Sequence, residues 1–288
     1  MAPWLIALAA TAAVAAAATV GTKAARRRLR SARDDHSRRP GLWNRFYAFD
    51  WGDTATNNYG FAPAEGDHPQ RFQHQMYREL LKRLALRRPL TPSLRLLEVS
   101  CGRGGGLNAF VGAAPEVFDA TGLDVAASAI DYCRRTYADK AERLHFVEGS
   151  ALALPFPDGS FDVVLNVEAS NDYGDRPGFF REVSRVLKEG GIFLYTDSFK
   201  TPDVATMRRE FEAAGFAGEF DDITANVAEA CRLDSPRRRQ VIRDHAPLPL
   251  KLLLKEQLEN YAGVEGSRKH LAFTNGKRTY LMTAARKG

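Results

Sequence analysis

Cysteine is scarce in this sequence of 288 residues, and none of it is arranged to bind a metal. The three cysteines, Cys101, Cys133 and Cys231, lie far apart, with neither Cys-X-X-Cys spacing nor nearby histidines. This dispersed, odd-numbered set argues against structural zinc and against a disulfide framework, and it favours a reducing compartment. We therefore expect no metal site.

Net charge is absent from most of the chain. The formal charge of +6 comes from residues 23–40, which hold eight Lys/Arg and two Asp, whereas residues 41–288 hold 33 basic and 33 acidic side chains. Proteins that bind nucleic acid usually carry a basic surface, so we expect no nucleic-acid partner. With 44% hydrophobic and 26% charged residues, the chain is able to build one large α/β domain or two small ones.

Charge of either sign is also missing from residues 1–22. Their number matches the ~20 residues with which a helix crosses ~30 Å of hydrocarbon. Basic residues follow the apolar stretch instead of preceding it, unlike a secretory signal, and positive charge marks the cytoplasmic side. We predict a transmembrane anchor over 1–22, a basic linker over 23–40 and a cytoplasmic catalytic domain. A cleaved signal or transit peptide and a surface helix are the alternatives.

Beyond residue 93, short apolar runs alternate with helical stretches, which predicts a mostly parallel sheet with helices on both faces. Strands are expected over 95–99, 118–124, 143–149, 161–167, 191–198 and 277–287, with one more within 218–227. Helices are expected over 69–87, 105–112, 126–138, 176–188 and 203–214, and within 226–261. Residues 41–70 are expected to form an aromatic-rich loop. We assign 41–93 to an N-terminal cap and 94–288 to the main domain, with a cap insertion at about 225–268.

A glycine-rich loop follows the first expected strand in the stretch LLEVSCGRGGG, residues 96–106. Glycines without a Cβ let a ligand approach the main chain. A phosphate loop is excluded because Leu107, and not lysine, follows the last glycine. The dinucleotide pattern fits Gly102 and Gly104 but requires a small residue where Leu107 stands. Asp124 lies at the end of the second strand, where a carboxylate accepts hydrogen bonds from ribose hydroxyls in either nucleotide class.

Three further features accompany this loop: an acid within the first strand, EGSALALPFPDGSFDVVLNVEA over 148–169, and REVSRVLKEGGIFLYTD over 181–197. Together and in this order they resemble class I methyltransferases that use S-adenosylmethionine (SAM). The stretches LEVSCGRGGG, NVEAS, DITANV, NNYGF and AGVEGS narrow the resemblance to one branch. That branch contains the mycobacterial phthiotriol dimycocerosate methyltransferases and O-methyltransferases of bacterial natural products.

The resemblance implies a Rossmann-like sheet of seven strands, an antiparallel last hairpin, SAM as cofactor and a helical substrate cover. The residues predicted to bind the cofactor are Tyr59, Glu98, Ser100, Gly102, Gly104, Asp124, Val125, Ser150, Ala151, Asn166 and Glu168.

The resemblance implies a specific role for five of these residues. Glu98 would orient the loop and the methionine amine, unless it is a buried acid satisfied by backbone amides. Asp124 would bind the ribose, and Ser150 stands where the family usually has an aspartate at the adenine amino group. Asn166 lies at a strand end and should face the methionine group. Glu168 would face the cofactor or the substrate, with a structural ion pair as the equal alternative.

Transfer of the methyl group to a hydroxyl requires positioning and is helped by a base. His245, Asp172 and His74 are the candidate bases, each with a surface or packing role as the alternative. Related enzymes often have histidine where Asn171 stands. The aromatic residues Trp43, Phe46, Tyr47, Phe49, Trp51, Tyr59 and Phe61 would roof an apolar substrate pocket, or simply form the core of the cap.

We therefore expect a membrane-tethered SAM-dependent methyltransferase that acts on a hydroxyl of a hydrophobic small molecule, such as a lipid or a secondary metabolite, without a metal. Methylation at carbon of a sterol, quinone or isoprenoid is the first alternative. A catalytically silent SAM-binding scaffold is the second, and a nicotinamide-dependent oxidoreductase is more distant.

Deletion of residues 1–40 should release the protein from membranes and leave SAM binding intact, because the predicted anchor lies outside the cofactor domain. Fractionation of cells that express the full or the shortened chain, with SAM affinity measured on both, tests this. A shortened chain that still sediments with membranes would place the attachment elsewhere.

Overall fold

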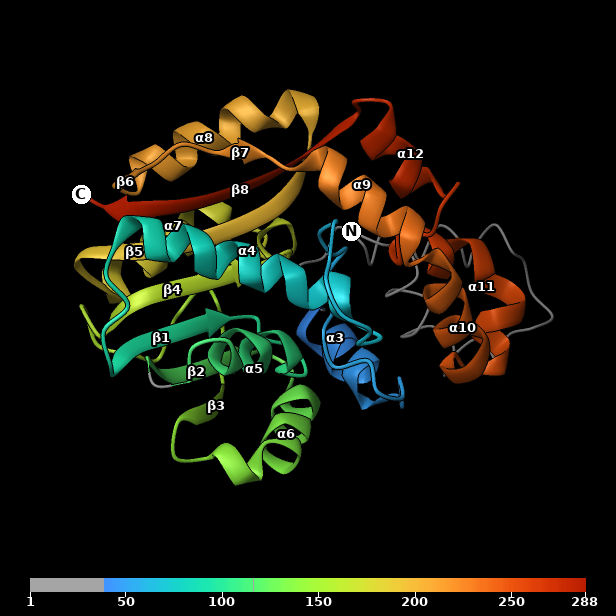
Figure 1. The fold of residues 1–288 in the computed structure, drawn as a ribbon, viewed down its shortest axis with the longest axis horizontal. Coiled ribbons are helices and arrows are strands. Elements are labelled where there is room, and N and C mark those ends of the chain that lie inside the picture. Colours follow the sequence, from blue (N-terminus) through green and yellow to red (C-terminus); the bar gives the residue numbers. More distant parts are fainter. Residues whose placement is uncertain (1–38, 116) are drawn as a thin grey trace.

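The computed structural model describes residues 39–115 and 117–288. The anchor predicted over residues 1–22 and nearly all of the basic linker lie outside the described residues. Among the described helices, none is both long enough and apolar enough to cross a bilayer. The described part of the chain folds around one sheet that carries helices on both faces (Figure 1).

The sheet has eight strands within the described residues. They are β1 (Leu94–Val99), β2 (Phe118–Asp124), β3 (Leu144–Glu148), β4 (Phe161–Val167), β5 (Leu187–Lys200), β6 (Phe216–Ala217), β7 (Asp221–Asp222) and β8 (Arg278–Lys287). Their order is β3-β2-β1-β4-β5-β8-β6, and β7 also pairs with β8. Strands β1 to β5 are parallel, and β8 is antiparallel to its neighbours. The predicted Rossmann-like, mostly parallel sheet is confirmed.

The prediction of seven strands was wrong, because the chain forms two short strands here, β6 just before the range 218–227 and β7 within it. Strand β6 pairs with the end of β8 and β7 with its middle. Between them an added Cβ on Gly218 would come within 2.9 Å of β8, so the chain passes close over its neighbour there. The Asp222 carboxylate then accepts a hydrogen bond of 2.9 Å from the Thr224 amide, where helix α9 (Thr224–Leu233) begins.

Side chains of the central strands alternate between two cores, one on each face of the sheet. On β1, Leu94 and Leu96 enter the core that contains α4, α5 and α6, whereas Leu97 and Val99 enter the core beneath α7 and α8. These helices are α4 (Arg71–Arg87), α5 (Gly105–Gly112), α6 (Ala127–Thr136), α7 (Arg176–Val186) and α8 (Val204–Ala213), with short 3-10 helices η2 (Ala138–Lys140), η3 (Ser170–Asp172) and η4 (Thr201–Asp203). The bounds of α4 to α8 lie within two residues of those predicted.

The segment 41–70 was expected to be a loop, and this was wrong for its first part, which forms helix α3 (Arg39–Ala48). The helix has no clear apolar stripe of its own, so its sequence gave little sign of it. Tertiary contacts stabilise it instead, because Phe46 packs on Trp51 and on Tyr261, with ring centroids 5.0 and 6.0 Å apart.

The C-terminal cap consists of α9, α10 (Ser235–His245), α11 (Leu248–Tyr261) and α12 (Arg268–Thr274). The stretch predicted to be helical over 226–261 is therefore helical, in three separate pieces. In Figure 1, α3, α10 and α11 lie beyond the end of the sheet toward which the arrow of β1 points. Both caps thus stand over the carboxyl ends of the parallel strands, where ligands of such sheets bind.

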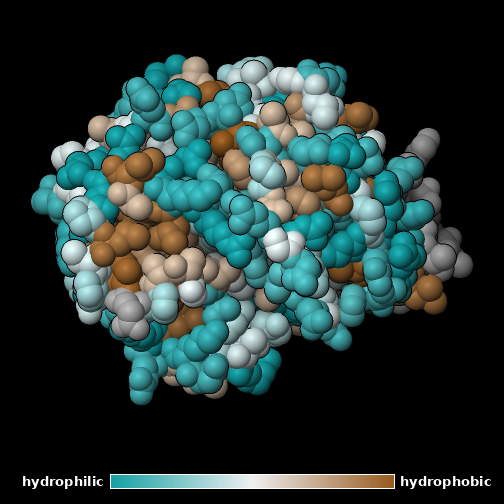
Figure 2. Space-filling view, viewed as in Figure 1, coloured by the Kyte–Doolittle hydropathy of each residue, from teal (hydrophilic) through white to brown (hydrophobic). Residues whose placement is uncertain are grey.

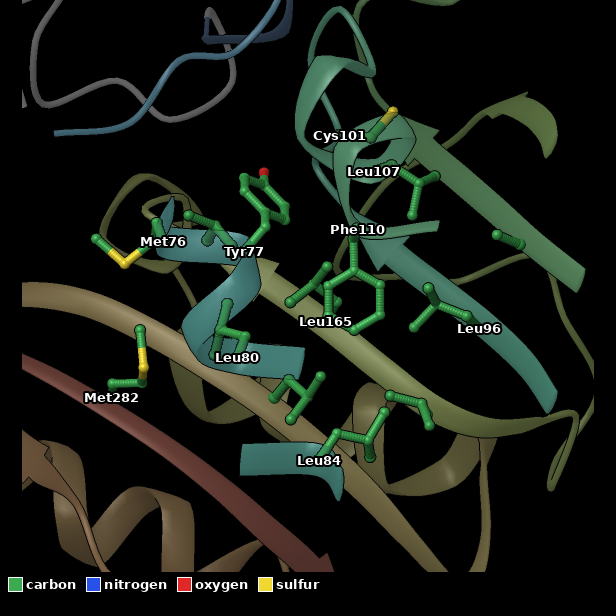
Figure 3. Packing of buried hydrophobic residues seen from close by; sticks show 14 of the residues in the cluster. Met76, Tyr77, Leu80, Leu84, Leu96, Cys101, Leu107, Phe110, Leu165 and Met282 are labelled. Atoms are coloured by element: carbon green, nitrogen blue, oxygen red, sulfur yellow. The ribbon is translucent and has the colours of Figure 1, made fainter. Parts of the chain in front are cut away.

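Helix α4 is the main link between the N-terminal cap and the sheet. Met76, Leu80 and Leu84 are fully buried along one side of it and belong to the same hydrophobic core as Leu165, part of which Figure 3 shows. The opposite side is open to solvent, with Leu86 exposed to 85%. In Figure 2 most of this face is hydrophilic, and apolar surface gathers at the left, where β1 begins between α4 and α5.

Leu80→Ala should destabilise the protein by about 2–5 kcal/mol, because it leaves a cavity in a fully buried contact. Leu86→Ala on the same helix is the matched control and should change stability by no more than about 0.5 kcal/mol. Urea unfolding of both variants measures the difference. Equal losses in the two variants would mean that α4 does not dock through this side.

Candidate active site

A cavity of about 280 Å³ opens at the carboxyl ends of the parallel strands. Residues that follow β1, β2, β3 and β4 form one side of it, together with the end part of β5. Its cover comes from α3, residues 57–59, the end of α11, α12 and the start of β8. The strand order reverses between β1 and β4. This switch point is the place where open α/β sheets bind their ligands.

Most of the predicted cofactor residues meet in this cavity. Its lining includes Tyr59, Ser100, Asp124, Val125, Ser150, Ala151 and Glu168. Glu98, Gly102, Gly104 and Asn166 are not among the lining residues and lie behind them. The structure therefore brings together residues from five separate segments of the chain.

Asp124 ties the glycine loop to the second strand. Its Oδ2 accepts a hydrogen bond from the Gly102 amide, and its Oδ1 accepts one from the Ala126 amide, each 2.9 Å long. The side chain is only 4% exposed, and burial raises the pKa of Asp124 to about 6. The carboxylate thus holds the loop and lines the cavity at the same time.

The loop between β1 and α5 has backbone conformations that favour glycine. Gly102 and Gly104 have φ of +54° and +72°, and an added Cβ on Gly102 would lie 2.7 Å from the Tyr47 hydroxyl. Ser100 also has a positive φ, +62°, which is uncommon for a residue with a side chain. Ser100 lines the cavity, whereas Gly102 is buried behind it between Tyr47 and Asp124. This arrangement fits the methionine and ribose parts of SAM.

Glu98 lies beneath the loop and faces α4. The Tyr77 hydroxyl donates a hydrogen bond of 2.7 Å to its Oε1, and burial raises the pKa of Glu98 to about 8. Its Oε2 has no hydrogen-bond partner in the part of the chain that the structure describes. Gly106 makes room for the Tyr77 ring, since an added Cβ there would come within 1.9 Å of it. Glu98 is therefore connected to the loop only through Tyr77, which packs against Gly106.

Asn166 belongs to a small polar network that the sequence did not reveal. Its Nδ2 donates to the Val99 carbonyl at 2.9 Å and to the Tyr173 hydroxyl at 2.8 Å. The same hydroxyl shares a hydrogen bond of 2.7 Å with Ser100 Oγ. Tyr173 thus joins the ends of β1 and β4 at the cavity wall. It follows Asp172 directly in the sequence, where only the acid was considered as a functional residue.

Glu168 occupies a strained position in the cavity wall just after β4. Its φ is +55°, and its Oε1 accepts hydrogen bonds from the Tyr59 amide, at 2.6 Å, and from the Tyr280 hydroxyl. Burial raises the pKa of Glu168 to about 7. Strained residues of this kind often mark functional sites. Ser100, Asp124, Val125, Ser150 and Ala151 line one half of the cavity, called the cofactor half below. The Glu168 carboxyl lies between this half and the cap.

Two cations and a further acid lie beside Glu168, and sequence reasoning missed all three. Lys269 and Arg278 line the cavity from α12 and β8, and Asp197 lines it from β5. The Lys269 ammonium stands 5.5 Å from the centre of the Tyr59 ring, and burial lowers the pKa of Lys269 to about 8. Asp197 lies near the end of the strand expected over 191–198. The reasoning that placed Asn166 at the site, namely that ligands bind at strand ends, therefore applies to Asp197 as well. No local motif surrounds either cation.

The three predicted bases fall in different places. Asp172 lines the cavity. His245 does not, and its ring lies 2.6 Å from where a Cβ on Gly52 would be. His74 lies on α4 with its ring centroid 4.4 Å from that of His68, and burial lowers the pKa of His74 to about 4. The two histidines are therefore outside this cavity.

Comparison with known proteins agrees with this geometry. A family profile described as "Methyltransferase domain" matches residues 97–195. A phthiotriol/phenolphthiotriol dimycocerosates methyltransferase of Mycobacterium leprae is 31% identical over 75% of this chain and 76% of its own length. This chain belongs to the SAM-dependent methyltransferases. It is an enzyme of that class with SAM as its cofactor, as the sequence predicted.

Two other similar proteins match this chain over a smaller share of their own length. A probable phthiotriol/phenolphthiotriol dimycocerosates methyltransferase 2 of Mycobacterium ulcerans is 38% identical over 60% of this chain and 65% of its own. A fatty-acid O-methyltransferase of Mycolicibacterium smegmatis is 38% identical over 52% of each chain. The chain thus spans between half and two thirds of these two relatives.

Solved structures agree on the fold. The [4+2]-cyclase SpnF has a TM-score of 0.67 at 18% identity, over 86% of this chain and 96% of its own. A geranyl diphosphate methyltransferase in complex with SAM has a TM-score of 0.59 at 17% identity, over 82% of this chain and all of its own.

Asp124→Ala should weaken SAM binding by about 1–3 kcal/mol through loss of hydrogen bonds to the ribose and to the loop. Titration calorimetry at pH 7.5 measures it. In the unchanged enzyme, affinity should also fall as the pH drops below about 6, since a protonated Asp124 accepts hydrogen bonds less well. Unaltered affinity in the variant would remove Asp124 from the cofactor site.

Proposed function

We propose that this enzyme transfers the methyl group of SAM to a hydroxyl of a lipid-like small molecule, with Glu168 as the base. The observation that carries the proposal is the position of this buried carboxyl. It lies in the wall of the cavity, and in the sequence it directly follows β4. The names of the relatives support a lipid acceptor, and one of them is named as an O-methyltransferase.

The chemistry asks the protein for a base and for a dry, ordered cavity. Bound SAM supplies an activated methyl group, which passes to the acceptor oxygen as the carbon–sulfur bond breaks. Glu168 would take the hydroxyl proton, and its pKa near 7 suits this step at neutral pH. The hydrogen bonds from the Tyr59 amide and the Tyr280 hydroxyl both reach its Oε1, so its Oε2 is the atom that would take the proton. The nearby Lys269 ammonium favours the ionised form.

The caps would exclude water from the reaction. Helix α3 and the end of α11 close the cavity from one side through Tyr47 and Tyr261, and α12 closes it from the other. Ordering of the acceptor between these walls supplies the positioning on which methyl transfer mainly depends. We keep the anchor over residues 1–22 as a proposal from sequence alone. It would place the covered cavity close to substrates dissolved in the membrane.

Glu168→Gln should lower the rate of methyl transfer by about 10²–10⁴-fold, because the amide cannot accept the proton. SAM affinity should change little. Transfer of a labelled methyl group from SAM to a total lipid extract, with mass spectrometry of the product, measures the rate and identifies the acceptor. The rate in the unchanged enzyme should rise with pH through about 7 as Glu168 loses its proton.

Asp172→Asn is the matched control, since it removes another carboxylate from the same cavity. A larger loss there than in Glu168→Gln would assign the base to Asp172. A labelled product with a new carbon–carbon bond would favour the C-methyltransferase alternative. SAM binding without any labelled product would favour a silent scaffold.

A further inference from the structure

A second cavity, of about 110 Å³, lies beside the first within the cap. It is a partly open cavity lined by α3, residues 54–58, α10 and the end of α11, together with Gln73 and Arg103. Its apolar lining comes from Phe46, Trp51, Val241, Ile242 and Leu258, which belong to one hydrophobic cluster. None of these residues takes part in the cofactor half of the first cavity.

The two cavities share a wall. Tyr47, Asn57, Asn58, Tyr261 and Ala262 line both of them. At this wall the Asn57 side-chain amide donates a hydrogen bond of 2.5 Å to the Tyr261 hydroxyl. These side chains separate the two spaces, so the second cavity lies directly beside the cap side of the first.

The charged groups around the second cavity are already engaged. Arg103 donates to the carbonyl of Tyr47 at 3.2 Å and to that of Phe49. Arg237 and Arg238 donate to the Asp234 carboxylate at 2.7 and 2.9 Å. Each of these guanidinium groups thus donates to protein acceptors, although Arg103 Nε and the Thr56 hydroxyl, both buried, have no partner within the described residues. The remaining lining is mainly carbon, which favours a hydrocarbon over a polar ligand.

We propose that this second cavity binds the hydrocarbon chain of the acceptor while its hydroxyl lies in the first cavity near Glu168. The inference deepens the proposed function and rests on it for the position of the hydroxyl. It assigns the acceptor to molecules with a flexible alkyl chain, since the route passes between Tyr47 and Tyr261. Each methylene that leaves water should raise affinity about fourfold until the cavity is full.

Trp51 lines the second cavity and provides a direct readout, because a bromine atom quenches indole fluorescence on contact. The probe is 10-bromodecan-1-ol, added to the full chain with saturating S-adenosylhomocysteine. We expect saturable quenching, which Trp51→Phe should largely remove. Unbrominated alcohols of increasing length should compete about fourfold better per added methylene up to a limit.

Val241→Phe should fill the cavity and weaken binding of the probe at least tenfold, while affinity for S-adenosylhomocysteine stays unchanged and reports an intact fold. Val204→Phe is the matched control, because Val204 is also partly buried and packs in the core beneath α8. It should leave probe binding unaltered. Absence of saturable quenching, no dependence on chain length, or equal effects of the two variants would overturn the inference.

The same alcohols separate this inference from the proposed function. Binding that follows chain length without methyl transfer to any alcohol or lipid hydroxyl would leave the cavity assigned and remove the hydroxyl as acceptor. Methyl transfer to alcohols with no effect of chain length or of Val241→Phe would support the hydroxyl as acceptor and overturn the assignment of the second cavity.

Discussion

The site depends on one constraint, which is a stretch of bare main chain fixed between three side chains. Asp124 holds the loop through the Gly102 amide, Tyr47 closes it from the N-terminal cap, and Tyr77 fills the space left at Gly106. A Cβ at either glycine would collide with one of the tyrosines. The loop is therefore packed behind the cavity wall and unable to move far, which suits a binding site that must be ordered before its ligand arrives.

Three buried carboxyl groups surround this loop, and burial raises the pKa of each. Removal of a carboxylate from water is costly unless hydrogen bonds replace its solvation. Asp124 receives two backbone amides, Glu168 an amide and a hydroxyl, and Glu98 a single hydroxyl. Glu98, which receives the fewest hydrogen bonds, has the highest pKa of the three, about 8, against about 6 for Asp124 and about 7 for Glu168. Burial with a single donor thus favours the protonated form most strongly at Glu98.

Much of the cofactor half could be predicted because local sequence determines it. Asp124 ends a strand 22 residues after Gly102, and parallel strands bring such ends to one edge. The cap could not be predicted in this way. Helix α3 is stabilised by contacts with residues some 200 positions away, and Lys269 lies on a helix of seven residues without a motif. His74 resembled a base in sequence, but the packing of α4 places it against His68, away from the cavity.

This difference between the two halves follows from how each is built. The cofactor half uses the ends of neighbouring strands, whose spacing is set by hydrogen bonds across the sheet. The cap side joins Tyr47 and Tyr59, from before the first strand, to Tyr261 and Lys269, from just before the last strand. A substitution in α10 or α11 can therefore reshape the space around an acceptor without disturbing Asp124 or the glycine loop. Glu168 is the point where the halves meet, because the Tyr59 amide and the Tyr280 hydroxyl both donate to it. Its ionisation should thus respond to changes in the cap that leave cofactor binding untouched.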